Sequence, residues 1–405
     1  MTIRIEADLL IPGRGDPVAA GSVILDGPNI AYAGPSADAP ETPGAKVTSV
    51  ATVMPGLWEC HGHFLGEPSP DPEVWAKANP VTQTARAVAD VQRMLEGGVT
   101  SVRELGGIGL MMQPAIADGS IPGPTIYGAG DTLSATAGHG DTHGFPLEWV
   151  HDGAGFGYMC DGVPECLKAV RIQLRKGARV IKIHATGGVI SEVDHPQHQQ
   201  FSPEELSVIV EEAARAERVV AAHCHGKAGI MAALEAGVKT IEHGSYLDEE
   251  AARLMIELDA ILVPTRFVVV QLVEAEDILP RYAYEKIIAI ADDHAGALKT
   301  AVAAGVRIAM GTDIFISGDA YGRNSLEIVH LQNAGLSALE AIEAATATGP
   351  LTLGPQGPQS GQLVAGYDAD VIAIDFDPLQ DNSGWGDRDR VTHVWKAGEA
   401  VKAPE

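Results

Sequence analysis

The sequence predicts an α/β protein: a (β/α)8 TIM barrel with a small β-sandwich domain that is built from both chain ends. The middle of the chain, residues 55–356, alternates short apolar strands with helical patterns, as barrels of about 250 residues do. Both ends, residues 1–54 and 357–405, contain short strands between Gly and Pro turns and no long helix. Histidines, a lysine and an aspartate recur at the ends of the middle strands. A doubly wound sheet is the alternative architecture.

The two chain ends are expected to pair into one domain. At the N-terminal end, strands are predicted at 3–5, 7–11, 22–25 and 30–34, with a hairpin-like turn at 26–29. At the C-terminal end, strands are predicted at 361–364, 370–374 and 391–395. The barrel is then an insertion between the two halves of this domain.

The barrel is predicted from eight strands separated by helices. The apolar run 51–54 leads into the first strand, before His61, and the others are expected at 99–105, 124–130, 180–185, 219–223, 240–243, 261–265 and 308–313. Helical patterns cover 203–217, 227–236 and 284–304. Gly177, Gly237 and Gly305 stand where such helices would end.

The composition limits the class of function. The 405 residues include 28 Lys and Arg against 54 Asp and Glu, a net charge of −26. This charge argues against nucleic acid and anionic membrane surfaces as partners. The sequence contains no apolar run of about 18 residues and no signal-peptide core at its start. The four cysteines are too few for a disulfide framework, so we expect a cytoplasmic protein.

Two histidines separated by one residue, His61 and His63, can point to one side of a strand. Neutral imidazole is a common ligand of zinc and related metals. Further ligand-capable residues lie in or at the ends of later strands: Lys182, His223, His243 and Asp313. The C-terminal strand ends of a TIM barrel meet at one mouth, where its chemistry occurs. Lys182 lies among apolar residues, and a buried ammonium group needs a partner or a modification.

These motifs resemble those of the amidohydrolase superfamily in its binuclear-metal subtype, over nearly the whole chain. The resemblance implies that six residues bind two divalent metal ions, usually zinc in this family: His61, His63, Lys182, His223, His243 and Asp313. It implies that Lys182 carries a CO2-derived carbamate, which would turn a buried cation into an anionic ligand. The segments 137–141, 183–188, 222–226 and 241–246 resemble the prolidase-like and imidazolonepropionase-like branch. Glu59 stands where relatives usually have Asp.

The same resemblance suggests residues that contact the substrate. His139 resembles a histidine that hydrogen-bonds the scissile carbonyl, and Tyr246 resembles a substrate-contacting tyrosine. His184 would shape the pocket, and Arg266 or Arg323 could bind a carboxylate. The loop 194–198 is expected to cover the mouth.

We therefore expect a metal-dependent hydrolase of C–N amide-type bonds in small molecules, in which Asp313 transfers the proton. The first choice of substrate is a dipeptide or an N-acyl amino acid. The alternatives are neutral aryl amides or phenylureas, a cyclic amide as in imidazolonepropionase, and a non-catalytic scaffold. We also expect a homo-oligomer.

Overall fold

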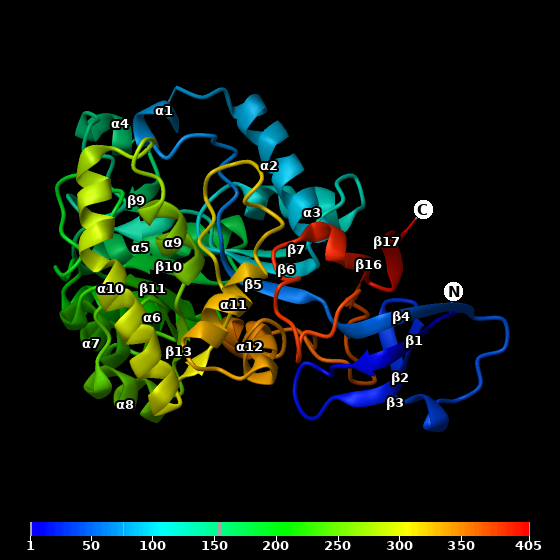
Figure 1. Cartoon of the computed structure of the whole chain (residues 1–405). Coiled ribbons are helices and arrows are strands. Elements are labelled where there is room, and N and C mark those ends of the chain that lie inside the picture. Colours follow the sequence, from blue (N-terminus) through cyan, green and yellow to red (C-terminus); the bar gives the residue numbers. More distant parts are fainter. Residues whose placement is uncertain (1, 76, 152–154, 405) are drawn as a thin grey trace.

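The computed structural model of the protein describes residues 2–75, 77–151 and 155–404. Figure 1 shows a large helical body that surrounds parallel strands, and beside it a smaller domain of strands in which β1–β4 of the N-terminal end lie near β16 and β17 of the C-terminal end. The predicted α/β class and the β-rich domain made from both chain ends are confirmed.

The large body is a barrel of parallel strands. They are β5 (Leu57–Gly62), β6 (Val99–Glu104), β7 (Thr125–Gly128), β10 (Ile181–His184), β11 (Val220–Cys224), β12 (Thr240–His243), β13 (Ile261–Val263) and β14 (Arg307–Ile308). The runs β5–β7 and β10–β14 each pair in parallel. Two backbone hydrogen bonds of 2.9 Å join the runs, from Arg179 N–H to the Gly128 carbonyl and from Cys60 N–H to the Met310 carbonyl. All C-terminal strand ends therefore open at one mouth.

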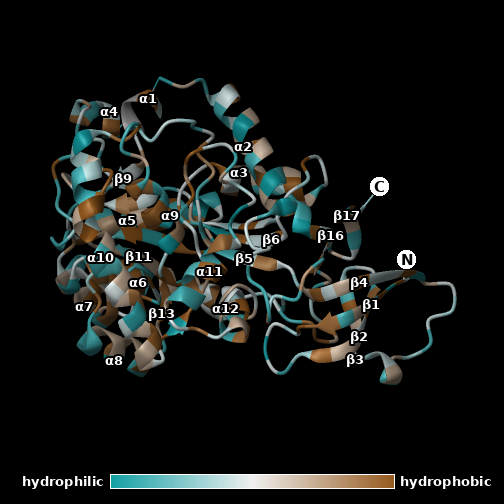
Figure 2. Cartoon of the chain, in the orientation of Figure 1, coloured by the Kyte–Doolittle hydropathy of each residue, from teal (hydrophilic) through white to brown (hydrophobic). Residues whose placement is uncertain are grey.

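Helices cover the outside of the barrel (Figure 1). They are α1 (Pro72–Trp75), α2 (Pro80–Glu96), α3 (Gly109–Ala117), α4 (Leu147–His151), α5 (Gly162–Lys176), α6 (Pro203–Arg215), α7 (Lys227–Glu235), α8 (Glu249–Glu257), α9 (Arg266–Val273), α10 (Arg281–Ala304), α11 (Leu326–Asn333) and α12 (Ala338–Ala344). Hydrophilic and hydrophobic residues alternate along α10 (Figure 2), as expected for a helix with one buried face. Its buried residues include Ile287, Ile290 and Leu298.

The smaller domain is one continuous seven-stranded sheet in the order β17-β16-β15-β4-β1-β2-β3. Its strands are β1 (Thr2–Leu10), β2 (Val18–Asp26), β3 (Asn29–Pro35), β4 (Lys46–Pro55), β15 (Val371–Ile374), β16 (Val391–Lys396) and β17 (Glu399–Lys402). Alternate residues such as Ile3, Ile5, Val23 and Leu25 form its apolar core. The strand β4 lies between β1 and β15, so the two chain ends are joined through it.

Several of the expected strands differ in the structure. The run 51–54 belongs to β4 of the smaller domain, and the barrel begins only after Gly56. The strand expected at 124–130 is the shorter β7, and an additional strand, β8 (Thr132–Ser134), follows it and pairs with β9 (Gly157–Met159). The segment 361–364 is not a strand: Gly361 has a φ of 74°, which ends an extended run, although Leu363 packs into the core of the smaller domain.

Short 3-10 turns complete the chain: Ser36–Asp38, Gly349–Gln356 and Arg388–Arg390. None of the described helices has the length and apolarity that crossing a membrane requires.

Candidate metal centre and cavity

Predicted ligands from three strands, β5, β10 and β14, meet at the barrel mouth. The Nε2 atom of His63 lies 3.0 Å from the Asp313 carboxylate, and the Nε2 atom of His61 lies 3.5 Å from it. Single donor atoms of these three residues all lie within 4.8 Å of one another. The Lys182 Nζ atom is 3.2 Å from His61 Nε2. The fold thus brings together His61 and Asp313, which are 252 residues apart in the sequence.

The two later histidines lie against this group. The ring centre of His243 is 5.0 Å from that of His61 and 4.6 Å from that of His223. All six residues predicted as ligands therefore surround one space, and each comes from a strand or from the loop that follows one.

The backbone at this mouth has an unusual conformation. His243 and Asp313 have φ values of 68° and 57°, and Thr265, which contacts His243, has 53°. Residues with a side chain rarely adopt the left-handed region, and each such residue costs roughly 1–3 kcal/mol. Strain of this kind is typical of functional sites, where it turns a side chain toward the site.

Hydrogen bonds determine which nitrogen of each histidine is free. Nδ1 of His61 lies 2.8 Å from the Glu242 carboxylate, and Nδ1 of His63 lies 2.8 Å from the Gly106 carbonyl. Both partners only accept, so each Nδ1 carries the proton and each Nε2 has a free lone pair. In His223 the roles are reversed, because its Nε2 lies 3.1 Å from the Gly187 carbonyl.

Arg103 holds Glu242 in place below the mouth. Its guanidinium, which is fully buried, donates to both Glu242 oxygens at 2.8 and 2.9 Å and to the Cys60 carbonyl at 2.6 Å. Burial alone would raise the pKa of Glu242, but Arg103 and His61 stabilise the carboxylate more strongly and lower its pKa to about 2. Glu242 is therefore a permanent acceptor for His61.

Burial keeps three of the predicted imidazole ligands neutral. It lowers the pKa of His61 to about 4 and the pKa values of His223 and His243 well below the usual value. Burial would raise the pKa of Asp313, but His61, His63 and Lys182 hold it below its usual value. Burial also lowers the pKa of Lys182 to about 8. Neutral imidazoles with a carboxylate are the donors that divalent transition metals prefer, so the residues fit a metal centre.

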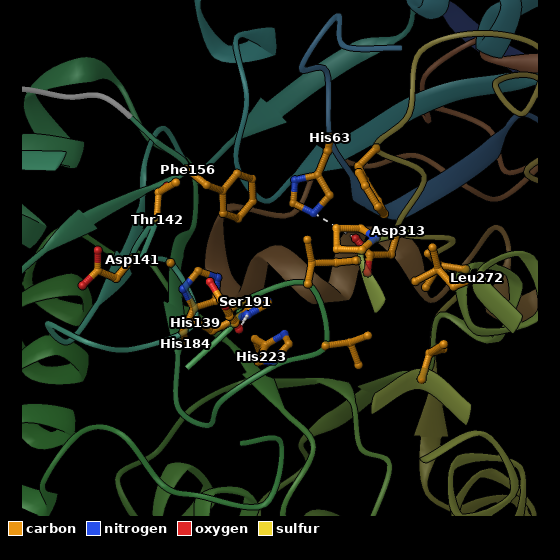
Figure 3. Close-up of a pocket in the computed structure, with 18 of the residues that line it drawn as sticks. His63, His139, Asp141, Thr142, Phe156, His184, Ser191, His223, Leu272 and Asp313 are labelled. Atoms are coloured by element: carbon orange, nitrogen blue, oxygen red, sulfur yellow. Dashed lines mark hydrogen bonds and ion pairs between the residues drawn. The ribbon is translucent and has the colours of Figure 1, made fainter. Parts of the chain in front are cut away.

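A cavity of about 360 Å³ opens beside these residues (Figure 3). Its polar part holds the predicted ligands together with His139, His184 and His225, and Figure 3 shows His139, His184 and His223 close together. Its apolar part lies against α9 and α10 and is lined by Val189, Val268, Val269, Leu272, Ile287 and Phe315. The cavity can therefore hold a substrate with one polar and one apolar end.

The structure places the other predicted substrate contacts differently. His139 and His184 line the cavity, but Tyr246, Arg266 and Arg323 do not. The Arg266 guanidinium donates to the Ala291 carbonyl at 2.9 Å and is thus directed toward α10. Tyr246 packs with an apolar cluster beside α9, and Arg323 is exposed. The two arginines follow strands in the sequence, but neither lines the cavity, and the Arg266 guanidinium turns to α10.

The loop after β10 contributes to the wall of the cavity. Val189, Ile190, Ser191 and Glu192 line it, whereas the part 194–198, which we expected as a cover, lies outside this lining. His143 also lines the cavity, and sequence reasoning missed it. Its Nε2 atom is buried without a hydrogen-bond partner among the described residues. Its position four residues after His139, in the same Gly-rich loop, was the available signal.

Glu59, Cys60 and Cys224 lie next to predicted ligands in the sequence or the fold, and their contacts indicate structural roles. Glu59 accepts hydrogen bonds from the N–H groups of His61 and Thr312, both at 2.9 Å, and so ties the first and last strands together. Burial raises the pKa of Cys60 to about 12 and raises that of Cys224 as well. Both thiols are therefore protonated and unreactive at neutral pH.

A TIM barrel with histidines, a lysine and an aspartate around one cavity at its C-terminal mouth defines the class of metal-dependent hydrolases. The sequence model of the Amidohydrolase family matches residues 52–401. The chain therefore belongs to the amidohydrolase family, and it is a hydrolase of C–N amide bonds. The predicted resemblance and enzyme class are confirmed, and the scaffold alternative has no support.

Individual relatives agree with this assignment. The chain is 44% identical to ochratoxinase from Aspergillus niger over 99% of its own length and 86% of the relative's. The crystal structure of that enzyme has a TM-score of 0.94, with 100% of this chain and 96% of the other covered. A prolidase complexed with N-methylphosphonate-L-proline is 32% identical, with a TM-score of 0.91 and full coverage of both chains. A Xaa-Pro dipeptidase with bound methionine is 30% identical, with a TM-score of 0.89 and full coverage of both chains.

Proposed function

We propose that this protein hydrolyses the amide bond of an N-acyl amino acid or dipeptide that carries a large apolar group. The observation that carries the proposal is the cavity, in which the predicted metal ligands face an apolar wall from α9 and α10. The similarity to ochratoxinase and to enzymes that act at proline supports an amide of an amino acid.

We propose that His61, His63, His223, His243, Asp313 and a carbamate on Lys182 would hold two divalent metal ions, most simply zinc. Bound there, the metals would supply Lewis-acid activation of water and of the carbonyl group. The lowered pKa of Lys182 supports the carbamate, because only the neutral amine reacts with CO2. Elemental analysis of protein produced with added zinc should give two ions per chain, and protein without metal would contradict the proposal.

The chain's own residues would handle the proton. Asp313 is a carboxylate at neutral pH and lies beside His61 and His63, at the polar end of the cavity. From there it can take a proton from the attacking water and return it to the leaving nitrogen. The substrate would lie with its apolar group against Val268, Val269 and Leu272, which excludes water from that side.

His143 is our candidate for binding an oxygen of the substrate. The N–H of Val193 lies 3.3 Å from His143 Nδ1, which therefore accepts, so that the proton of a neutral ring is on Nε2. This Nε2–H is buried in the cavity lining without a partner among the residues that the structure describes, and leaving a buried donor unpaired is costly. A carboxylate or carbonyl oxygen of the substrate would satisfy it.

A neutral aryl amide or urea is the second candidate, and one observation favours it. Among the described residues that line the cavity, Lys182 is the only lysine or arginine, and a carbamate would remove its charge. The described lining therefore offers a substrate carboxylate no cationic side chain, which favours a neutral substrate.

One matched pair of substrates tests the choice between them. We would compare kcat/KM for an N-acyl phenylalanine and for its carboxamide. If His143 binds the carboxylate, the acid should be preferred by about tenfold or more, and His143→Gln should reduce that preference. Equal values for both substrates would favour the neutral candidate.

A further inference from the structure

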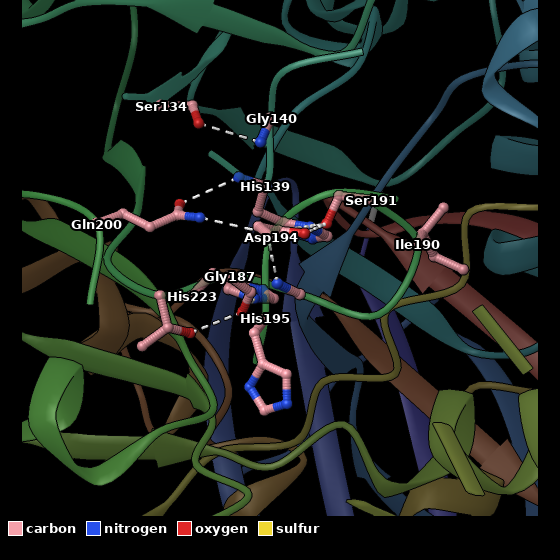
Figure 4. A network of polar contacts seen from close by, with 12 residues as sticks. Ser134, His139, Gly140, Gly187, Ile190, Ser191, Asp194, His195, Gln200 and His223 are labelled. Carbon is pink, nitrogen blue, oxygen red and sulfur yellow. Dashed lines mark hydrogen bonds and ion pairs between the residues drawn. The ribbon is translucent and has the colours of Figure 1, made fainter. Parts of the chain in front are cut away.

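A short chain of hydrogen bonds leads away from His139, and the mechanism above does not use it (Figure 4). His139 Nδ1 lies 2.8 Å from the Ser191 hydroxyl oxygen, and this hydroxyl is also hydrogen-bonded to Asp194. Ser191 and Asp194 both lie in the loop that follows β10. The loop thus carries the partners of a histidine from the preceding barrel segment.

Asp194 is surrounded by hydrogen-bond donors. Its Oδ2 atom accepts from the Gly188 N–H at 2.9 Å and from the Gln200 amide at 3.3 Å, and its Oδ1 atom lies 3.3 Å from Lys286 Nζ. Its side chain is only 4% exposed. A carboxylate with these partners can only accept hydrogen bonds.

Because Asp194 can only accept, the donor and the acceptor of each hydrogen bond between Asp194, Ser191 and His139 are determined. Ser191 has one hydroxyl proton, and it must go to Asp194, because Asp194 has none to give. The Ser191 oxygen then accepts the proton of His139 Nδ1. A neutral imidazole has a single N–H, so His139 Nε2 carries a lone pair. His139 lines the cavity, and no described residue is hydrogen-bonded to Nε2.

We infer that Asp194 and Ser191 are positioning residues that hold His139 in its Nδ1–H tautomer, so that its Nε2 accepts a hydrogen bond from an N–H group of the substrate. The inference rests on the proposed function, because it assumes an amide or urea in the cavity. It reverses the role expected from the sequence, in which His139 donates to the scissile carbonyl. The site should then prefer secondary amides, which have an N–H, over tertiary ones.

Lys286 of α10 keeps the loop in the required position. Its ammonium donates to the carbonyls of Ser191 and Asp194, both at 2.6 Å, and to that of Gly188 at 3.3 Å. Gly188 also lets the His139 ring approach, since a Cβ atom there would lie 2.2 Å from the ring. The ring is therefore packed against the backbone of the loop that supplies its hydrogen-bond partner.

The tautomer can be read directly by nitrogen NMR. Zinc-loaded full-length protein with ring-15N histidine would be measured, and His139→Gln would identify the resonances of His139. We expect a protonated Nδ1 and an unprotonated Nε2, and Ser191→Ala or Asp194→Asn should raise the share of the Nε2–H form. A wild-type His139 protonated at Nε2, or variants that leave its tautomer unchanged, would overturn the inference.

The substrate preference gives a second, kinetic readout. For a secondary amide and its N-methyl analogue, the ratio of kcat/KM should favour the secondary amide, and Ser191→Ala should lower that ratio about five- to hundredfold. Asp381→Asn and Ser383→Ala are matched controls, because Ser383 donates to Asp381 at 2.9 Å on an exposed loop, and neither should change the ratio. An unchanged ratio in Ser191→Ala would overturn the inference. If neither amide is cleaved, the proposed function fails, while the NMR result still decides the tautomer.

Discussion

Lys182 shows how one residue links burial to chemistry. It is 2% exposed, it lies 3.2 Å from a histidine nitrogen, and burial lowers its pKa to about 8. The lowered pKa increases the fraction of neutral amine, and this is the form that can react with CO2 to give the proposed anionic metal ligand.

Lys182→Ala should therefore reduce zinc content and lower kcat by about a hundredfold or more, because a bridging ligand is lost. Formate or acetate should restore part of the activity, since a small carboxylate can occupy the position of the carbamate. Activity and zinc content would be measured with and without added formate. Lys299→Ala, on the exposed surface of α10, serves as the control. Full zinc content and normal turnover in Lys182→Ala would refute the bridging role.

The proposed role of Asp313 in proton transfer can also be tested with a single substitution. Asp313→Asn keeps the shape of the side chain but removes its ability to take a proton. We expect kcat at saturating zinc to fall by about 10²–10⁴. Turnover within a few-fold of wild type would mean that another group transfers the proton.

At the scale of elements, two helices have their N-terminal ends capped by a buried glutamate from elsewhere in the fold. Thr265 precedes α9, but its hydroxyl is hydrogen-bonded to His243 Nδ1 at 2.7 Å and does not cap the helix. Glu327 of α11 instead accepts from the N–H groups of Arg266 at 2.8 Å and Phe267 at 2.6 Å. Glu104 caps α3 in the same way, through Gly109 and Leu110. In α9, the threonine is therefore free to orient a predicted metal ligand.

Glu327 should make stability depend on pH. Burial raises its pKa from 4.5 to about 8, although the two N–H donors act in the opposite direction. Between pH 4.5 and 8 the unfolded chain loses this proton while the folded protein keeps it, so the contribution of Glu327 to stability falls as pH rises, by up to about 1.4 kcal/mol per unit. Below pH 4.5 both states are protonated and the contribution is complete.

The change Glu327→Gln removes the ionisable group and so tests whether Glu327 makes stability fall as pH rises. The free energy of unfolding from urea titrations at several pH values between 5 and 7.5 should decline less steeply in the variant than in wild type. The slope is the readout, because the amide also satisfies the helix end less well and lowers stability at every pH. Parallel slopes would show that Glu327 is ionised throughout.

At the scale of the whole molecule, Gly56 alone separates β4 of the smaller domain from β5 of the barrel. Its N–H donates to the Asp370 carbonyl at 2.9 Å, so it also contacts the C-terminal half of the smaller domain. A Cβ atom at Gly56 would lie 2.1 Å from the Thr100 hydroxyl oxygen. The strand β5, which carries the predicted ligand His61, is thus connected to the smaller domain at a position with no room for a side chain.

Gly56→Ala should destabilise the protein by about 1–3 kcal/mol through this overlap. Thr100→Ala is the matched control: its hydroxyl is buried without a hydrogen-bond partner among the described residues, so its loss should be nearly neutral. The double variant should recover part of the loss. Strict additivity of the two changes in unfolding free energy would show that the contact with Thr100 is not the cause.

The sequence by itself determined the alternation of strands and helices, the composite domain of the two chain ends and the six candidate ligands. These features depend on local patterns, namely the period of apolar residues, turn residues, and polar residues at strand ends, all of which are visible in a linear chain. The barrel topology then brings the strand ends together, so the site of the ligands followed from the fold class.

Only the tertiary structure decided where individual side chains point. Arg266 follows a strand, as Asp313 does, but its guanidinium turns to α10 while the Asp313 carboxylate turns to the histidines. The hydrogen-bonded residues His139 and Ser191 are 52 positions apart in the sequence. Glu327 and Arg266, whose N–H it accepts, are 61 positions apart. The physical reason is that hydrogen-bond direction and burial depend on neighbours in space, and a one-dimensional pattern does not contain them.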